Sequence, residues 1–522
     1  MSKDAGPTAE ADPNALDRDT LVVAAVVMLG AVMSILDTTV VNVAIDRLAA
    51  DFHSSLTTIQ WAVTGYTLAL AAVIPLSGWA SDRFGTKRIY LASLVLFTLG
   101  SALSGLSWNA GSLILFRVLQ GIGGGMIMPV VMTIVTKKAG PHRIGRIMGV
   151  LGVPMLVAPI VGPILGGWLV DDVSWRWIFF VNLPVGVAAF ILAQLVLEPD
   201  RPKRSERLDV LGLLLLSPGL ALLIYGLAQS SPYGFSDARS WAPIVGGAAL
   251  IAVFLRHSWR SRNALIDVQT FVKTRAGLSA VVFTLFAISF FGALLLIPLY
   301  YQSVRHASAL TAGLLLVPQG VGAMITMPVA GRLTDRYGPS KLPVAGIPLL
   351  VIGLLPFAFV SAHTSYALLS SFNFVLGLGM GFSMMPTMTA AMQAVPASAI
   401  ARVSTAMNII RQAGASIGTA VLTVVLSTQI DHKFATIPGA HGGGGFSSVQ
   451  KLPPDVQAKV NAPLADAFAH AFVWATVMLA VALIPALVMA FRKPLEPARM
   501  GGAPALGDRE GELATSSALD LG

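Results

Sequence analysis

The chain has 522 residues, of which 55% are hydrophobic and only 12% are charged, and its mean hydropathy is +0.74. A soluble domain carries about 25% charged residues, so this composition excludes an ordinary soluble protein and predicts a membrane protein. The chain contains no cysteine, which excludes disulfides, thiolate metal sites and cysteine nucleophiles.

Apolar runs of about 20 residues, long enough to cross a hydrocarbon core about 30 Å thick, recur along the chain. They predict about 14 transmembrane helices. The first run is too long for a cleaved signal peptide and is expected to remain as an anchor. The expected spans are 21–44, 57–81, 89–106, 111–135, 147–170, 177–196, 208–228, 241–256, 277–300, 309–331, 342–361, 366–392, 403–427 and 469–491.

The 35 Lys and Arg residues exceed the 26 Asp and Glu residues, which gives a net charge of +9. Most of these cations lie in alternate loops, beginning with the segment before the first span. This distribution follows the positive-inside rule and predicts that both termini are cytoplasmic. The membrane is expected to be the inner membrane of a bacterium. Because orientation explains the excess, the charge gives no reason to expect a nucleic-acid partner.

An internal repeat divides the chain into two halves. The segment from Gly78 to Gly85, GWASDRFG, recurs as GRLTDRYG from Gly331, each time in a short inside loop. Six spans then match six spans in the same orientation, which is typical of a transporter built from two rocking bundles. The expected units are a cytoplasmic segment 1–20, a six-helix bundle 21–196, two inserted helices with linkers 197–275, a second bundle 276–492 with a long loop 428–468, and a disordered tail 493–522.

Three ionisable residues lie inside the expected spans, where a charge costs at least about 2.5 kcal/mol and so suggests a function. Asp37 and Arg117 lie at matching depth, roughly 10 Å below the outer surface, and are expected to be partners. A carboxylate facing a cavity near a guanidinium can switch between its protonated and charged forms, as proton coupling requires. The alternative is a permanent ion pair that only fixes packing.

Arg411 lies near the middle of its span and cannot face lipid. Either it lines the cavity or it ties the two bundles together through hydrogen bonds to carbonyls.

The repeated loops place Asp82 and Asp335 at a span end, before a glycine turn and next to cations. Each carboxylate is expected to cap the following helix and to pair with neighbouring arginines in one state only, so that the loop latches the inward-closed arrangement. A loop that only fixes topology is the alternative. The gating residues predicted here are Gly78, Asp82, Arg83, Gly85, Asp335 and Arg336.

The fifth span combines small residues with prolines, which lower helix stiffness and permit close backbone approach. Its candidate residues are Pro159, Gly162, Pro163, Gly166 and Gly167.

No histidine spacing in the chain suits a metal site, and no phosphate-binding loop is present. We therefore expect no enzyme activity, no metal and no cofactor, and an ion gradient as the energy source.

These motifs resemble those of the major facilitator superfamily, and within it the fourteen-span drug:proton antiporters of the EmrB/QacA type. The resemblance covers residues 20–492. It rests on LDTTVVNVA from Leu36, the loop from Gly78, RVLQG from Arg117 and GPILGG from Gly162. The resemblance implies an all-α major facilitator fold, export in exchange for protons, and Asp37 as the leading protonation and cation-recognition site.

The leading hypothesis is a proton-driven exporter of amphipathic, often cationic compounds, which confers multidrug resistance. Alternatives are the same machine dedicated to one endogenous metabolite, lipid or siderophore, and a receptor or scaffold that transports nothing. Partners would be small-molecule substrates, protons and membrane lipid; a periplasmic adaptor is compatible but nothing in the sequence requires one. Candidate cavity residues, which are as compatible with a core or lipid-facing position, are Trp61, Tyr66, Phe290, Tyr300, Met384 and Met388.

Overall fold

The computed structural model describes residues 17–140, 143–200, 207–261, 264–434 and 454–491. The regular elements in this part of the chain are helices. Thirteen of them are long and apolar enough to cross a membrane, and α6 adds a shorter apolar segment, Ile144–Met155. The chain is therefore a multi-pass membrane protein. The tail 493–522, and Gly442 to Gly445 of the long loop, lie outside the described residues.

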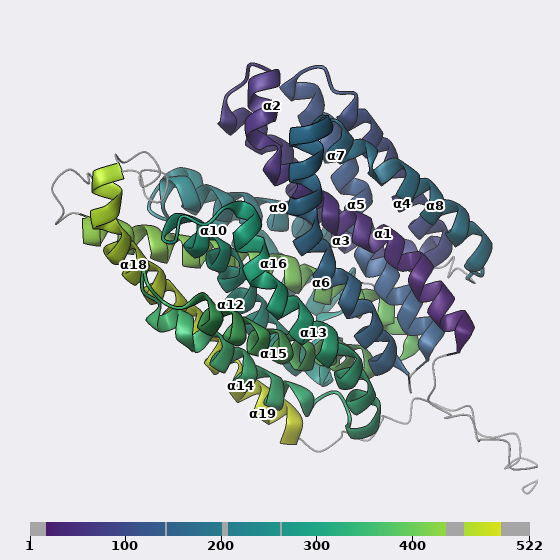
Figure 1. The fold of residues 1–522 in the computed structure, drawn as a ribbon. Helices are drawn as coiled ribbons and strands as arrows, with labels where there is room; N and C mark the ends of the chain where they lie inside the picture. The colour runs from purple at the N-terminus through teal and green to yellow at the C-terminus, as the bar shows by residue number, and fades with distance from the viewer. Residues whose placement is uncertain (1–16, 141–142, 201–206, 262–263, 435–453, 492–522) are drawn as a thin grey trace, which may run out of the picture.

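The N-terminal helices group at the upper right of Figure 1 and the C-terminal helices at the lower left. Their bounds in the first half are α1 Arg18–Val43, α2 Ile45–Asp51, α3 Leu56–Phe84, α4 Thr86–Gly105, α5 Ala110–Ala139, α6 Ile144–Trp168, a π-helix η1 Leu169–Val173, α7 Trp177–Phe180 and α8 Asn182–Val196. The inserted pair is α9 Val210–Tyr233 and α10 Ala238–Arg260, followed by α11 Val268–Lys273.

The second half repeats this order. It consists of α12 Ala276–Ser303, α13 Ala309–Tyr337, α14 Leu342–Leu354, η2 Leu355–Phe359, α15 Tyr366–Gln393, η3 Ala397–Ala399, α16 Ile400–Phe434, α18 Pro454–Val481 and α19 Leu483–Phe491. The packing repeats as well: α3 lies against α5 as α13 lies against α15, and α1 lies against α6 as α12 lies against α16.

The helix ends are set by local hydrogen bonds. Asp17, Ser55 and Asn109 accept from backbone N–H groups in the first turns of α1, α3 and α5. Gly85 and Gly338 end α3 and α13 at φ +92° and +87°, a left-handed conformation that favours glycine. This need explains why the repeated loop carries glycine at the same position in both copies.

Two helices extend beyond the spans expected from the sequence. The last span was expected from residue 469, but α18 begins at Pro454, and α16 continues to Phe434. Helices therefore enter the segment 428–468 from both sides. These extensions carry charged residues such as Asp431, Lys433 and Asp466, so hydropathy does not reveal them.

We call the side of the molecule where α1 begins and α19 ends the termini face, and the other side the opposite face. The inserted helix α9 packs on α3 of one bundle and on α16 of the other. Ile74, Leu216, Leu220 and Ile409 share one apolar cluster there. The inserted pair thus covers one of the two seams between the bundles.

Candidate functional site

Asp37 of α1 lies at the centre of a buried polar network. Its Oδ2 accepts a hydrogen bond of 2.6 Å from Arg117 Nη1. Its Oδ1 accepts from Gln120 Nε2 at 2.8 Å and from Asn182 Nδ2 at 3.2 Å. The side chains of Asp37 and Arg117 are 0% and 1% exposed. Three helices, α1, α5 and α8, therefore meet at one carboxylate.

Arg117 is held on every side by groups of its own bundle. Its Nε donates to the Ala62 carbonyl at 3.3 Å, and its Nη1 also donates to Gln120 Oε1 at 2.7 Å. The guanidinium lies 4.2 Å from the ring centroid of Tyr66. A guanidinium over an aromatic face gains a cation–π attraction, which is larger when both are desolvated. The ion pair of Asp37 and Arg117 has no net charge, and Tyr66 packs against its guanidinium.

Small residues bring these helices close enough to build the network. A Cβ added at Gly121, one turn beyond Arg117, would lie 2.5 Å from the Tyr66 carbonyl oxygen. One added at Gly100 of α4 would lie 2.6 Å from the backbone of Gln120. The glycines therefore let α3 and α4 approach α5 directly and place Tyr66 beneath Arg117.

The face of α1 beside Asp37 is polar along much of its length. Ser34 Oγ lies 3.4 Å from the Tyr66 hydroxyl, and one turn further on Thr38 is exposed. Asn42 is also exposed and donates to the Thr38 carbonyl at 3.3 Å. Thr38 also donates to the Ser34 carbonyl at 3.1 Å. These side chains form a polar stripe that leads from the level of Asp37 toward the opposite face.

Arg411 is not connected by hydrogen bonds to the network around Asp37. It forms no hydrogen bond or ion pair with any residue that the structure describes, and its Nε is buried without a partner. The residue as a whole is partly exposed. Of the two roles expected for Arg411, the hydrogen-bonded tie between bundles finds no support among the described residues.

The six candidate cavity residues lie in different surroundings. Trp61 stacks on Tyr225 of α9 at 5.7 Å between centroids and is 38% exposed. Tyr66 belongs to the Arg117 site. Phe290 is buried and stacks on Phe286 at 5.1 Å. Tyr300 is buried and donates to the Ser361 carbonyl at 2.7 Å.

Met384 and Met388 are buried one turn apart on α15 and belong to the main apolar core. Tyr66, Phe290, Tyr300, Met384 and Met388 are therefore inaccessible in this conformation.

The repeated acidic residues contact the other bundle. Asp335 Oδ1 and Oδ2 accept from the first N–H groups of α6, those of Gly145 and Arg146, at 3.0 and 3.1 Å. Asp82 Oδ2 lies 3.9 Å from Arg402 Nε on α16. Neither residue caps the helix that follows it, since α4 and α14 have no side-chain cap. The expectation that each carboxylate caps the following helix was wrong, because each one contacts a helix of the other bundle instead.

Glycines permit the same interface to close. A Cβ at Gly331 would lie 2.6 Å from the Gly145 carbonyl oxygen, and one at Gly149 would overlap the Met327 carbonyl. On the other seam, Ser77 Oγ lies 3.0 Å from Thr405 Oγ1. All these contacts lie near the termini face.

Two other predicted gating residues form no hydrogen bond between the bundles within the described part of the chain. Arg83 Nη1 is buried without a hydrogen bond, and the Arg336 guanidinium lies 5.3 Å from the ring centroid of Tyr337.

The glycine-rich part of α6 packs on α1. A Cβ at Gly162 would overlap Thr39 Oγ1, and one at Gly166 would lie 3.1 Å from Val40. A Cβ at Gly167 would meet nothing within 4 Å. Pro159 and Pro163 lie in the same helix, but their side chains are outside the described part. The predicted close approach therefore occurs at Gly162 and Gly166, within one bundle.

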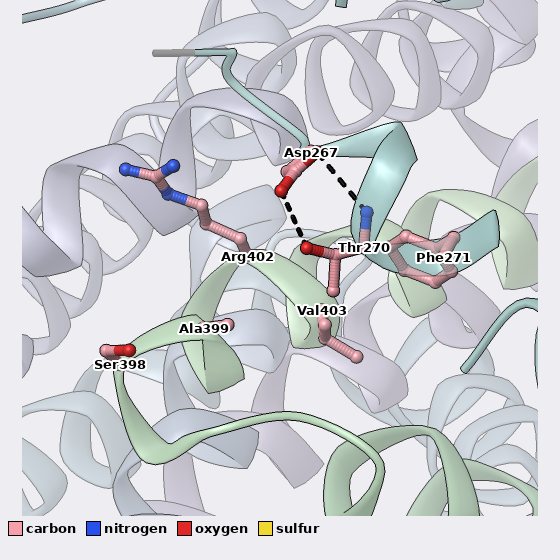
Figure 2. Close-up of a pocket in the computed structure, with 7 residues that line it drawn as sticks. All are labelled: Asp267, Thr270, Phe271, Ser398, Ala399, Arg402 and Val403. Atoms are coloured by element: carbon pink, nitrogen blue, oxygen red, sulfur yellow. Dashed lines mark hydrogen bonds between the residues drawn. The ribbon is translucent and has the colours of Figure 1, made fainter. Parts of the chain in front are cut away.

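A small cavity of about 180 Å³ lies at the termini face, between α11 and the start of α16. Figure 2 shows the Asp267 carboxylate turned toward Thr270, from whose N–H and hydroxyl it accepts hydrogen bonds. The Arg402 guanidinium extends away from Phe271. Sites for drug-sized ligands are about 300–1,000 Å³. This cavity is too small to be the cargo site.

Sequence reasoning assigned no role to Gln120 or Asn182, which complete the shell of Asp37. A signal existed, because buried amides inside spans need partners. The second bundle has a related feature: Asn373 of α15 donates to the Leu315 carbonyl at 3.1 Å, as Arg117 does to that of Ala62. The two acceptors lie in α3 and α13, which are equivalent helices of the two halves, so the repeat extends to these bonds.

Comparison with known proteins agrees with this architecture. The family model described as Major Facilitator Superfamily matches residues 27–419. A "Multidrug resistance protein B homolog" of Mycobacterium tuberculosis is 43% identical over 95% of this chain and 94% of its own length. The "Tetracenomycin C resistance and export protein" of Streptomyces glaucescens is 30% identical over 78% and 76%.

Among solved structures, that of the human organic anion transporter MFSD10 covers 89% of this chain and 100% of its own with a TM-score of 0.59. At 14% identity this likeness concerns the fold alone. The family match spans most of the chain, and the two repeated helical bundles agree with it. The chain belongs to the major facilitator superfamily.

Proposed function

We propose that this protein is a proton-driven exporter of amphipathic small molecules in the cytoplasmic membrane of a bacterium, with the termini face in the cytoplasm. The observation that carries the proposal is the buried carboxylate of Asp37, paired with Arg117 and reached by a polar stripe on α1. The printed names of the relatives, multidrug resistance and tetracenomycin C export, support the direction of transport and the kind of cargo.

Proton uptake by Asp37 would change the bonding of the whole network. A charged Asp37 accepts three hydrogen bonds, and its neutral form loses the charge-assisted bond to Arg117. Arg117 then remains bonded to Gln120 and to the Ala62 carbonyl, but it is a buried cation without a counter-ion. A change of conformation that hydrates Arg117 or brings a new partner relieves this cost, and this is how a proton drives the transition.

The route from Asp37 to the interface runs through packed helices. Thr39 and Val40, next to Asp37 on α1, contact Gly162 and Gly166 of α6. The other end of α6 carries Gly145, whose N–H binds Asp335 of the second bundle. A shift of α1 therefore moves a helix that also forms the seam at the termini face. Rigid elements of this kind transmit coupling when they have two arrangements.

The conformation described here corresponds to the outward-facing state of this cycle. The contacts between bundles that involve Ser77, Asp82, Gly145 and Asp335 lie at the termini face. In the same conformation Thr38 and Asn42 are exposed on the side toward the opposite face. Separation of these contacts would open the cytoplasmic side and load the cargo.

A second candidate function is export of one dedicated compound by the same mechanism. The relative named for tetracenomycin C favours it, since that name specifies a single compound. A dedicated exporter would discriminate tightly between close analogues, whereas a multidrug exporter would not.

The test is resistance of cells that lack their own drug exporters, with and without this chain, over a panel of unrelated amphipathic compounds. We expect resistance to several compounds, abolished by a protonophore and by Asp37→Asn at equal expression. Resistance that survives both treatments would refute proton-driven export.

A further inference from the structure

Helix α16 changes its surroundings at Arg411. From Ile400 to Ile409 nearly every residue is buried, and Ser404 Oγ donates to the Pro129 carbonyl of α5 at 3.1 Å. From Ile410 to Thr419 the buried residues are Gly414 and Gly418, which pack on α12 of the same bundle. The contact between α16 and the first bundle therefore ends near Arg411.

Arg411 lies on the face of α16 that points toward the first bundle. It follows Ser404 by seven residues, which is two turns with a rotation of about 20° and a rise of about 10 Å. Ser404 contacts α5, whereas Gly414 lies near Ala287 of α12. Arg411 thus points between α5 and α12, into the space between the bundles beyond the point where they touch.

No carboxylate in the described part of the chain pairs with Arg411. Away from the ends of the transmembrane helices, the described chain carries two carboxylates, Asp37 and Asp466 of α18. Asp37 accepts from Arg117 at 2.6 Å, and Asp466 pairs with Lys433. Arg411 has no ion pair or hydrogen bond to any described residue, and its Nε is buried. An unpaired cation at this depth costs several kcal/mol, so its retention calls for a partner that is not part of the fold.

We propose that Arg411 binds a negatively charged group of the cargo, a carboxylate or another oxyanion, so that the preferred substrates are amphipathic anions or zwitterions. This inference rests on the proposed export function and specifies its substrate class. It differs from the cationic cargo expected from the sequence, because the accessible charge is positive while Asp37 is enclosed and neutralised. The planar guanidinium matches a carboxylate with two parallel hydrogen bonds. A purely cationic compound is repelled at the same place.

The experiment is equilibrium binding of two dyes to the full chain in nanodiscs of phosphatidylcholine. Rhodamine 110 carries a free benzoate, and rhodamine 123 is its methyl ester, so the two share one xanthene core and differ at one acidic group. A buffer of low ionic strength, without carboxylate salts, limits competition by small anions. The proteins compared are the wild type, Arg411→Met, Arg411→Gln, Arg411→Lys and, as a control for loss of a cation, Arg47→Met on α2, whose side chain is 63% exposed.

We expect the wild type to bind the free acid at least about tenfold more tightly than the ester, the range of a charge-assisted hydrogen bond. Arg411→Met and Arg411→Gln should bring this ratio close to one, Arg411→Lys should retain part of it, and Arg47→Met should leave it unchanged. A wild type that prefers the ester, that binds the acid without saturation, or whose preference survives loss of Arg411 would overturn the proposal.

Thermal unfolding of the same proteins separates ligand binding from a structural role. Because Arg411 has no partner among the described residues, Arg411→Met should leave the Tm unchanged or raise it. A large fall in Tm in both neutral variants would show that the arginine holds the fold together, and would contradict the proposal. No gradient is applied, so these outcomes do not depend on proton coupling, and failure here would leave the export proposal standing.

Discussion

Arg117 of α5 donates a 2.6 Å hydrogen bond to Asp37 of α1, and both side chains are almost completely inaccessible. Two opposite charges at this depth are stable only together. Removing one partner of a buried pair costs about 3–5 kcal/mol, mainly because the other charge is left without compensation. The pair is therefore both a structural contact and a point at which a single proton changes the energy of the bundle.

The first prediction concerns the stability of this pair. Asp37→Ala should lower the free energy of unfolding by about 3–5 kcal/mol, because Arg117 remains buried and charged. The double variant Asp37→Ala/Arg117→Met should recover a large part of this loss. Denaturation of purified protein in detergent measures both. Additive losses in the double variant would show that the two residues are not coupled.

Arg117→Lys retains the charge but loses the planar fork that bonds Asp37, Gln120 and the Ala62 carbonyl together. We expect a smaller loss of stability than for Arg117→Ala, with a clear loss of transport. Equal transport by Arg117→Lys and wild type in proteoliposomes would remove the geometry of Arg117 from the mechanism.

A cross-link tests the closed seam at the termini face. Because the chain has no cysteine, Ser77→Cys/Thr405→Cys introduces a single pair, at positions whose hydroxyl oxygens lie 3.0 Å apart. Oxidation should form a disulfide between the bundles and stop transport, and reduction should restore it. Each single variant is the control. Undiminished transport by fully cross-linked protein would contradict alternating access through this seam.

A glycine substitution tests the other seam with a matched control on the same helix. An added Cβ at Gly331 lies 2.6 Å from the Gly145 carbonyl oxygen, whereas one at Gly313 meets nothing within 4 Å. Gly331→Ala should hold the bundles apart, increase the labelling of Ser404→Cys by a maleimide and slow transport. Gly313→Ala should do neither. Identical labelling in the two variants would argue against closure at Gly331.

The pH dependence of stability should be visible at the start of α1. The nearby Thr20 side chain and the Thr20 backbone N–H, which donates to Asp17 Oδ1 at 3.0 Å, hold the pKa of Asp17 below its usual 3.8, and Arg143 at 3.8 Å adds to this. The stabilisation is therefore complete above about pH 4 and is lost as the pH falls through the lowered pKa. Asp17→Ala should have a lower Tm than wild type at pH 7, and the difference should shrink below pH 4. A difference that does not vary with pH would contradict this role.

The sequence predicted the helical class, the repeat and the positions of most spans, because apolar runs and charged loops determine them directly. It also placed Asp37 and Arg117 at the same depth, and the structure forms this pair. Depth follows from counting residues along a helix. The rotation of each helix about its own axis does not follow from the sequence. For this reason the sequence did not identify Gln120 and Asn182 as partners of Asp37, and it did not predict the surroundings of Phe290 and Tyr300.

The contacts between bundles were beyond the sequence for a related reason. Asp335 and Arg146 are 189 residues apart. The residues around each of them do not indicate that the two will pair. The sequence therefore suggested a cap on the next helix, where the structure shows a cap on a helix of the other bundle. That Arg411 lacks a partner among the described residues could likewise be seen only once the structure showed Asp37 bonded to Arg117.

Proton coupling through Asp37 is the central claim, and transport in proteoliposomes tests it most directly. Purified wild type and Asp37→Asn are reconstituted with a transported dye, a pH gradient is imposed, and dye movement and internal pH are followed together. Asparagine keeps the size of the side chain and can still bond Gln120. The proposal predicts that the wild type concentrates the dye against its gradient while protons move in the opposite direction, and that Asp37→Asn only equilibrates it. Concentration of the dye by Asp37→Asn would contradict the proposal.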